Sequence, residues 1–588
     1  MVNVMGSETT SQQRSIIRGI PLSDEPGMGA LTIPGYLREV TSRFADAEAL
    51  VIHTPTAVVR WSYATLWQKS VEVAKALIAC GVGKNTRVGV LMTNRPEYLS
   101  AVFGTALAGG VSVNLSTFST PLELEQLLAA SGAAILLFER RVLKKDFGAV
   151  LAELEPEVLS AQSGRLRSTK FPFLSHLVRL EPAAAGEGST DLQASAFESW
   201  NGFLAKGRDV SDSIVDARSA SVTPGDPAGL FFSSGTTSLP KGILHAQRAF
   251  AIQWWRFPRA LNVEGAVRAW TGNGFFWSGN ITIVVGVALS TGGAVVLQPY
   301  FEPEQALRLF EAERVTFLQG RPHQWARLHE APNWQNADLS SVRYAMNGEL
   351  VRQHPSVRKT DWDVPMAYGT TETMAINTSC CEDPAREHPK GSFGLPLPGN
   401  VLKIIDPMTG NIQPRGTRGE VCIKGPTLMI GYISKTLEET FDEDGYFRTG
   451  DGGYVDVVGR LFWEGRLTEI IKTGGANVSP VEIEECLAKH PALKLALAVG
   501  VEHPTLGEVV VLCAVPVEGA RVEEAEIRAW LRERLAAYKV PKRVLAFAEG
   551  DLTYTGNQKV QVQPLREAAR KRLEAERAEI DGHRYGGA

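Results

Sequence analysis

Apolar and polar positions along the first part of the chain predict helices and strands in turn. Positions 67–80 have the spacing of an amphipathic helix, and Gly81 follows as its C-terminal cap. The apolar run at 87–92 predicts a buried strand, and 98–108 predicts the next helix. The same order then recurs, with a strand at 111–114, a helix at 122–130 and a strand at 133–138. Strands that alternate with helices predict βαβ units and a mostly parallel sheet.

The last part of the chain has a different order of elements. Positions 481–489 predict a helix, 495–501 and 508–515 predict two strands, and 523–536 predict a second helix. This order is typical of a compact α+β domain of roughly a hundred residues. The predicted fold class is therefore α/β, with a large N-terminal domain of mostly parallel sheets and a small α+β C-terminal domain.

Length and charge narrow the class of protein. A chain of 588 residues is too long for one core. With 61 basic and 65 acidic residues the net charge is −4, which gives no electrostatic case for nucleic acid. The apolar run at 281–289 is shorter than a membrane span of about 20 residues. The N-terminus lacks the apolar core of a signal peptide, and the six cysteines have no CxxC spacing. We expect a cytoplasmic protein with reduced thiols, no transmembrane segment and no zinc site.

The residues at 231–242 combine an apolar lead with hydroxyls, glycine and one cation. This pattern predicts a strand that ends in a loop rich in backbone N–H donors, which suits a polyphosphate. It is not a Walker A loop, because Pro240 precedes the lysine and Gly242 follows it. A plain surface loop rich in Ser, Thr and Gly is the alternative. The candidate phosphate-binding residues are Ser233, Ser234, Gly235, Thr236, Thr237 and Lys241.

The order of residues in this loop closely resembles the phosphate signature of the adenylate-forming superfamily, the acyl-CoA synthetases and their relatives. The resemblance extends from about position 34 to position 565, with five separate motifs in order. It implies that ATP, Mg²⁺ and coenzyme A are used to convert a carboxylic acid first to an acyl-adenylate and then to a thioester. It also implies a mobile C-terminal domain. The expected boundaries are an N-terminal arm at 1–28, a large AMP-binding domain at 29–465, a hinge at 466–470, a small domain at 471–565 and a charged, solvated tail at 566–588.

A second matching motif begins at Tyr368 and Gly369. The tyrosine ring can stack on adenine, Thr371 can donate a hydrogen bond to the α-phosphate, and Glu372 can hold Mg²⁺. Upstream, the superfamily has a small-residue turn against the adenine. Here the turn reads Asn347, Gly348 and Glu349, which departs from the usual small residues.

The third and fourth motifs contain Asp451 and Arg466. A carboxylate at position 451 can accept hydrogen bonds from both ribose hydroxyls, although an acid in a glycine-rich turn is commonplace. The resemblance implies that Arg466 reaches the nucleotide. At the hinge, Thr468 stands where Asp or Lys is usual.

The small domain carries the remaining candidates. The resemblance places Lys472 near the site in the thioester-forming pose, and Gly474 and Gly475 beside the pantetheine arm, where only glycine lets a backbone approach closely. Lys559 resembles the closing lysine that acts during adenylation, but Gln558 replaces the usual glycine before it. The expected catalytic residues are Lys559, Lys472, Thr237 and Lys241.

Four aromatic residues are candidates for the acid pocket: Trp254, Phe275, Phe276 and Trp277. The resemblance places the last three near the acyl tunnel, and an apolar wall there favours a large hydrophobic acid. An aromatic stripe on a helix and a bulky turn are also typical of plain core packing.

Three other functions stay open. The enzyme can load the acyl group onto a free carrier protein. It can adenylate weakly, because of Gln558, and thioesterify an acyl-adenylate made by a partner enzyme. A nucleotide-binding protein without catalysis is the alternative from another class, and AMP formation distinguishes it from the enzymes.

Overall fold

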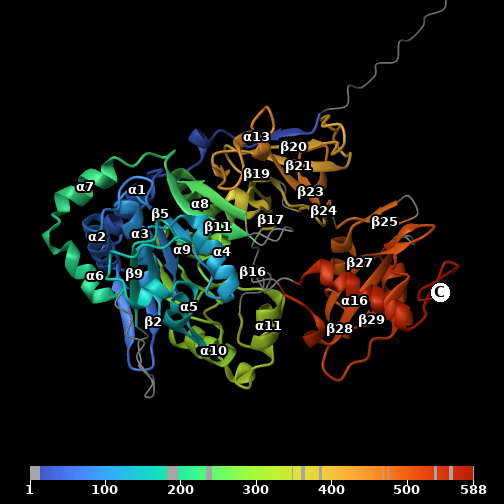
Figure 1. The fold of residues 1–588 in the computed structure, drawn as a ribbon. Coiled ribbons are helices and arrows are strands. Elements are labelled where there is room, and N and C mark those ends of the chain that lie inside the picture. Colours follow the sequence, from blue (N-terminus) through green and yellow to red (C-terminus); the bar gives the residue numbers. More distant parts are fainter. Residues whose placement is uncertain are drawn as a thin grey trace, which may run out of the picture.

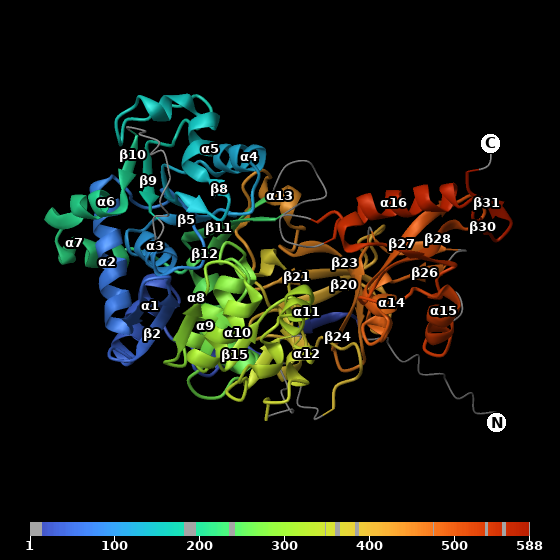
Figure 2. The ribbon, with the colours of Figure 1, turned by 90° about the horizontal axis from the view of Figure 1, so that it is seen from below.

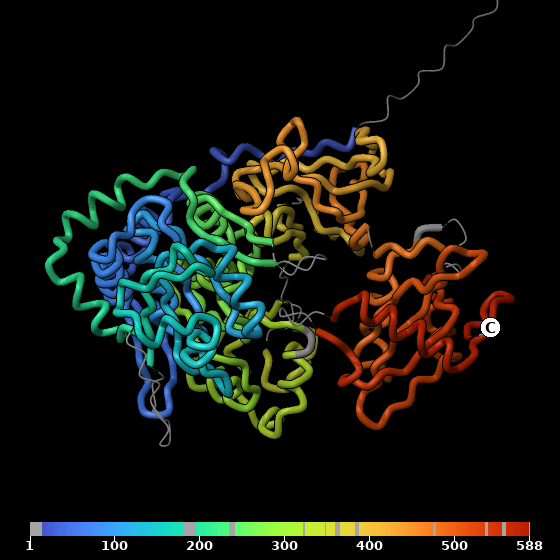
Figure 3. The backbone as a smooth tube through the Cα atoms, in the orientation of Figure 1, coloured from blue at the N-terminus to red at the C-terminus, as the bar shows by residue number. Residues whose placement is uncertain are grey.

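The computed structural model describes residues 14–181, 196–233, 241–346, 348–358, 365–382, 387–467, 469–473, 476–535, 539–554 and 560–586. Two bodies are visible in Figures 1 and 3, a large one built from the chain up to Arg466 and a small one, drawn in orange and red, built from the rest. This division confirms the predicted fold class. An ion pair of 3.2 Å between Lys494 Nζ and Glu330 Oε1 connects the two bodies.

One sheet of eight strands carries the predicted βαβ units. Its order is β10-β9-β6-β4-β5-β11-β12-β22, and β9, β6, β4, β5 and β11 are parallel neighbours. The predicted strands form as β4 (Arg87–Leu91), β5 (Val111–Asn114) and β6 (Ile135–Glu139). The other strands are β9 (His176–Leu180), β10 (Phe197–Ser199), β11 (Pro227–Ser233), β12 (Lys241–Ala246) and β22 (Gly431–Tyr432).

The helices between these strands begin and end close to their predicted positions. Gly81, with φ of +85°, follows the first of them in the left-handed region that favours glycine. Thr120 and Glu123 form a reciprocal capping box at the start of another. The helices on and around this sheet are α2 (Tyr63–Ala79), α3 (Pro96–Leu107), α4 (Pro121–Ser131), α5 (Phe147–Leu154), α6 (Trp200–Lys206) and α7 (Asp212–Ala220).

A second sheet of six strands lies against the same core. Its order is β16-β15-β13-β14-β2-β3, and only β3 is antiparallel to its neighbour. The core cluster that contains residues of both sheets also contains most of α8 (Gln247–Ala260) and α9 (Ser278–Leu289), so these two helices are buried between the sheets. The strands are β2 (Glu48–His53), β3 (Val58–Ser62), β13 (Arg268–Thr271), β14 (Ala294–Leu297), β15 (Phe317–Gln319) and β16 (Tyr344–Met346), and the helices nearby are α1 (Ile33–Arg43), α10 (Pro303–Ala312), α11 (Pro322–His329) and α12 (Glu349–Arg352).

An antiparallel sheet, ordered β1-β20-β21-β23-β24, completes the large body. Its first strand, β1 (Ile16–Arg18), pairs with β20. Glu25 follows and forms an ion pair of 2.6 Å with Arg256, both fully buried. The expectation of a loose arm over 1–28 is therefore wrong for residues 14–28, because pairing and burial fix this segment. The other strands are β20 (Val401–Ile405), β21 (Gly419–Lys424), β23 (Phe447–Val455) and β24 (Leu461–Arg466), and a short sheet contains β17 (Ala367–Tyr368), β18 (Thr378–Ser379) and β19 (Leu395–Pro396).

The small body is an α+β unit, seen in Figure 2 with its helices around one sheet. The sheet contains β25 (Ile471–Thr473), β26 (Ala476–Val478), β27 (Leu493–His503), β28 (Gly507–Pro516) and β29 (Arg543–Ala546), and the helices are α14 (Pro480–Leu487), α15 (Glu524–Arg532) and α16 (Val562–Ala575).

The expected boundary at position 565 and the solvated tail beyond it are wrong. Leu565, Ala569 and Leu573 form a buried stripe on α16 that packs in the same cluster as strands β27 and β28. A hairpin of β30 (Glu579–Ile580) and β31 (His583–Arg584) follows, and Ile580 belongs to that cluster. In the described part of the chain, none of the helices has the length and apolar character needed to cross a membrane.

Candidate nucleotide and acid-binding site

The proposed phosphate loop connects two paired strands. Ser233 ends β11 and lies opposite Lys241, the first residue of β12. The ammonium of Lys241 is 5.6 Å from the ring centroid of Tyr432, which lies on the neighbouring strand β22. Four candidates of the loop, Ser234, Gly235, Thr236 and Thr237, lie outside the described residues.

Tyr432 also contacts the second motif, where Thr371, Glu372 and Thr373 form one turn of 3₁₀ helix. The tyrosine hydroxyl donates a hydrogen bond of 2.7 Å to Oε1 of Glu372. Burial and the adjacent carboxylate raise the pKa of Tyr432 above its usual range, so the phenol keeps its proton and donates. The structure thus brings Lys241 and Glu372 together through Tyr432, a residue that the sequence analysis missed.

The backbone after Gly369 is held in an unusual shape. A Cβ atom at position 369 would lie 1.7 Å from the carbonyl oxygen of Ala375, so only glycine fits there. Met374 and Ala375 have φ of 55° and 83°, in the left-handed region. The side-chain amide of Gln253 donates to the carbonyls of Met374 at 2.7 Å and Ile376 at 2.8 Å, which compensates for part of this strain.

A buried histidine supports the same turn. His245 on β12 donates from Nε2 to the carbonyl oxygen of Thr371 at 2.8 Å. Its side chain is fully buried, and desolvation lowers the pKa of His245 to about 4, so the imidazole is neutral at pH 7. His245 and Gln253 give no local sequence signal, because each acts on a backbone more than 100 residues away.

Tyr368, Asp451 and Arg466 form a second group. Asp451 lies opposite Arg466 in the pairing of β23 with β24, and Arg466 Nε is 3.0 Å from Asp451 Oδ1. The hydroxyl of Tyr368 donates to Asp451 Oδ2 at 2.5 Å. Burial raises the pKa of the Asp451 carboxyl, against the opposing effect of the Arg466 guanidinium. Two predicted nucleotide-binding residues, Tyr368 and Arg466, therefore both contact the carboxylate of a third, Asp451, and each of the three comes from a separate motif.

The ring of Tyr368 is mostly covered. It is only 5% exposed, and its centroid lies 6.3 Å from that of Trp463 and 6.5 Å from that of Phe393. Adenine stacking on this ring stays a prediction. Gly348 and Glu349 begin α12, and the Glu349 carboxylate is exposed, with its oxygen 3.8 Å from Arg352. Asn347, which precedes them, lies outside the described residues.

Of the small-domain candidates, Lys472 lies in the described part of the chain, on β25. Lys472 is exposed between two buried neighbours, Ile471 and Thr473. Its backbone N–H donates to Oε2 of Glu508 at 2.8 Å, which fixes the strand but leaves the ammonium group in solvent. Thr468, Gly474, Gly475, Gln558 and Lys559 lie outside the described residues.

Two of the four acid-pocket candidates are core residues. Trp254 is fully buried and packs on Tyr36, Phe103 and Phe250. Phe275 is 1% exposed. Both belong to the main hydrophobic core cluster, so the structure gives them a packing role and does not support the expectation that they line an acyl tunnel.

The other two candidates form an aromatic cluster with a residue that the sequence analysis missed. Phe276 and Trp277 contact each other and Phe118, a partly exposed residue in the turn after β5.

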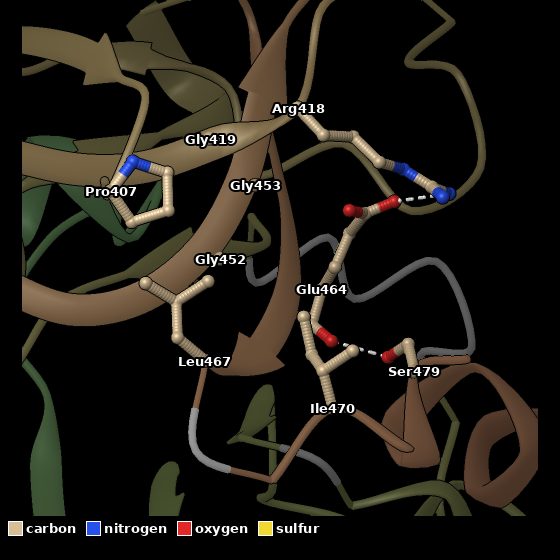
Figure 4. A pocket seen from close by; sticks show the side chains of 9 residues that line it. All are labelled: Pro407, Arg418, Gly419, Gly452, Gly453, Glu464, Leu467, Ile470 and Ser479. Atoms are coloured by element: carbon tan, nitrogen blue, oxygen red, sulfur yellow. Dashed lines mark hydrogen bonds and ion pairs between the residues drawn. The ribbon is translucent and has the colours of Figure 1, made fainter. Parts of the chain in front are cut away.

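A cavity of about 140 Å³ lies where the large body meets the hinge (Figure 4). Arg418 and Glu464 form an ion pair of 2.7 Å on its wall, and the Ser479 hydroxyl donates to the Glu464 carbonyl. The cavity adjoins the residues that follow Asp451 and Arg466. Its lining residues are Pro407, Arg418, Gly419, Gly452, Gly453, Glu464, Leu467, Ile470 and Ser479.

Comparisons with known proteins match both bodies. A family model described as AMP-binding enzyme matches residues 37–433, and one described as AMP-binding enzyme C-terminal domain matches 482–559. The indoleacetate–CoA ligase of Aromatoleum aromaticum is 30% identical over 507 residues, which cover 84% of this chain and 91% of that protein. A CoA ligase of Mycobacterium tuberculosis named for a methyl-dioxo-octahydro-indenyl propanoyl group is 30% identical over 524 residues, covering 87% of this chain and 94% of that one. The crystal structure of ATP-bound MatB from Rhodopseudomonas palustris is similar with a TM-score of 0.71 at 26% identity, covering 91% of this chain and 98% of that one.

Proposed function

Since this chain belongs to the AMP-binding enzyme family and is an ATP-dependent, AMP-forming acyl-CoA ligase, we propose that its acid substrate is large and apolar. The observation that supports this proposal best is the aromatic cluster of Phe118, Phe276 and Trp277, in which Phe118 follows β5, the parallel neighbour of β11. Two relatives are named for acids with fused rings, which agrees with an aromatic wall. Burying such a group contributes several kcal/mol at about 25 cal/mol per Å².

The first half-reaction joins the acid to AMP. A carboxylate oxygen attacks the α-phosphorus of ATP, and the bond to the leaving pyrophosphate breaks. Because several anions meet here, the site needs fixed positive and hydrogen-bonding groups. Lys241 supplies a cation at the edge of the phosphate loop, and Thr237 and Lys559 are the further candidates from the family resemblance. Asp451, which contacts Tyr368 and Arg466, is the proposed acceptor of hydrogen bonds from the ribose hydroxyls.

Glu372 fits the role of a magnesium ligand. Its carboxylate is partly accessible, and the single bond from Tyr432 leaves other lone pairs free to bind a cation. No cluster of three metal-binding side chains exists among the described residues, which suits an ion held jointly by one carboxylate and the nucleotide phosphates. Bound there, Mg²⁺ would neutralise charge on the phosphates.

In the second half-reaction the thiol of coenzyme A attacks the acyl carbon, and AMP leaves with its bonding electron pair. We propose that the small domain rotates about residues 466–470 for this step and brings Lys472, Gly474 and Gly475 to the site. The exposed ammonium of Lys472 is available for such a role.

Two alternatives stay within this enzyme class. Gln558 before Lys559 cannot take a positive φ without a cost on the order of 1 kcal/mol, which would weaken adenylation and favour an acyl-adenylate supplied by a partner enzyme. Transfer to a free carrier protein is the other. Synthetic acyl-AMP with CoA, compared with acid, ATP and CoA, tests the first alternative: similar rates of acyl-CoA formation exclude the adenylation deficit.

A screen of carboxylic acids for CoA-dependent AMP release tests the acid class. Ring-containing and long-chain acids are expected to give the highest kcat/KM. If acetate or propionate gives the highest value, the proposed class is wrong.

A further inference from the structure

Phe118 is the most exposed ring of the aromatic cluster. Its side chain is 42% exposed, although it packs against two other rings. The ring is stacked on Trp277, with centroids 5.8 Å apart and an interplanar angle of 27°. It meets Phe276 edge to face, at 5.7 Å and 82°. Part of the Phe118 ring is therefore held by packing against two other rings, and part of it is exposed.

A single lysine fixes the turn that carries Phe118. The Lys145 ammonium donates to three consecutive carbonyl oxygens, those of Thr117 at 3.2 Å, Phe118 at 2.7 Å and Ser119 at 2.9 Å. An ammonium group has three N–H donors, so it can donate one hydrogen bond to each of these three carbonyl oxygens. Partial burial lowers the pKa of Lys145, as expected for an ammonium whose hydration shell is replaced by carbonyls.

The opposite side of the cluster is equally rigid. Asn94 donates to the carbonyl of Asn273 at 2.8 Å and accepts from the backbone N–H of Phe275 at 2.8 Å. The Asn280 amide donates to the carbonyl of Gly274 at 3.0 Å. Phe276 and Trp277 are thus held on a fixed backbone. Phe276 is only 3% exposed and supports the other two rings, which carry the exposed part of a pre-organised surface.

The position of Phe118 in the fold indicates which ligand it can contact. The turn of Phe118 leaves the carboxyl end of β5, and the phosphate loop leaves the same end of β11, its parallel neighbour. Neighbouring strands are about 4.8 Å apart, and ligands of open α/β sheets bind at this end. In both ribbon views α4, which follows the turn, lies on the side of the large body nearest the small body. A ligand bound at this end of the sheet therefore lies on the same side of it as Phe118.

We propose that Phe118 is a specificity-determining residue whose open ring face stacks on a flat ring of the acid substrate, and that Lys145 is the positioning residue that holds it. The proposal rests on the proposed function and narrows the acid class from large and apolar to ring-bearing. The proposed stacking adds no chemical step. A fixed aromatic ring contributes more binding free energy to a planar ring than to a flexible chain.

The test compares a ring-bearing acid with a straight-chain acid of similar carbon number. Phe118→Ala is expected to raise KM for the ring-bearing acid roughly 10-fold and KM for the chain acid less than about 3-fold, with KM for ATP unchanged. Phe118→Tyr keeps the stacking face and should behave as the wild type. The matched control is Phe173→Ala, which removes another ring that is 67% exposed, far from any proposed role.

Lys145 is tested through a double-mutant cycle. Lys145→Met should raise KM for the ring-bearing acid while kcat changes little, and adding it to Phe118→Ala should cause no further rise, because the lysine acts through the ring. Lys170→Met is the matched control, since Lys170 also donates to a backbone carbonyl, that of Leu154. Additive effects would overturn the positioning role.

The outcomes also separate this inference from the proposed function. If wild-type enzyme forms acyl-CoA from ring-bearing acids but Phe118→Ala retains wild-type selectivity, the inference is wrong and the function stands. If the wild type forms acyl-CoA from none of the acids, the proposed function fails first.

Discussion

The hydroxyl of Tyr368 lies 2.5 Å from Oδ2 of Asp451, a residue 83 positions later in the chain. Asp451 in turn pairs with Arg466, the last residue of β24 and the first of the expected hinge. The second nucleotide motif is therefore connected, through one buried carboxylate, to the segment that joins the two bodies. A ribose bound at Asp451 would contact the hinge side of the site as well as the adenine side.

The first prediction removes the tyrosine donor. Tyr368→Phe leaves the buried Asp451 carboxylate with one partner fewer, and hydrogen bonds to charged groups contribute about 1.5–3 kcal/mol. KM for ATP should rise about 10-fold, and the free energy of unfolding should fall by roughly 1–3 kcal/mol. Tyr454→Phe, on the same strand β23, is the control and should change neither. An unchanged KM for ATP would show that the hydrogen bond from Tyr368 to Asp451 does not contribute to nucleotide binding.

The second prediction compares two glycines that face the same residue. A Cβ at position 369 would overlap the Ala375 carbonyl at 1.7 Å, whereas a Cβ at position 279 would lie 4.0 Å from the Ala375 side chain, an ordinary contact. Gly369→Ala should abolish AMP formation and lower the melting temperature, while Gly279→Ala should leave both near wild type. Equal tolerance of the two changes would show that the loop after Tyr368 is less constrained than its geometry indicates.

The third prediction concerns acid stability. The pKa of His245 is about 4 in the folded protein, below the value of 6.5 in the unfolded chain, so the unfolded state binds the proton first. The stability that depends on neutral His245 is complete above pH 6.5 and is lost as the pH falls toward 4.

Because the pKa of His245 is lower in the folded than in the unfolded state, a change from pH 7 to pH 5 reduces the free energy of unfolding by roughly 2 kcal/mol. His245→Gln keeps an amide donor for the Thr371 carbonyl but does not titrate. Its denaturant midpoint should therefore fall less than that of the wild type over this range. Parallel losses in the two proteins would assign the acid sensitivity to other groups.

The fourth prediction separates the half-reactions. Lys472→Ala should spare pyrophosphate release and slow the conversion of acyl-AMP to acyl-CoA, because the lysine lies on the small domain and, under the proposed rotation, acts only in the second half-reaction. Lys489→Ala, in the same domain, serves as the control. Equal loss of both half-reactions would contradict the assignment.

The regular part of the fold was predictable because its signals are local. The strand at Val111–Asn114 and the helix cap at Gly81 follow from a short apolar run and one glycine. The buried stripe of Leu565, Ala569 and Leu573 also has helical spacing, but the many charged residues around it favoured the prediction of a solvated tail. The pairing of β1 with β20 has no local signal, since its partner lies almost 400 residues away.

The residues of the site fall into the same two groups, those with a local sequence signal and those without one. Tyr368, Glu372, Asp451 and Arg466 stand in short motifs that the sequence displays. The residues that hold them, His245 and Tyr432, act through single bonds to distant segments, and such bonds leave no periodic pattern. Trp254 was misassigned because an aromatic residue on a helix has the same spacing in a core as in a pocket.

The most direct test of the account is product analysis with purified enzyme, a ring-bearing carboxylic acid, ATP, Mg²⁺ and coenzyme A. We expect AMP, pyrophosphate and acyl-CoA in equal amounts, with AMP release that depends on the acid. Release of ADP and phosphate in place of AMP, or no nucleotide turnover with any carboxylic acid, would contradict it.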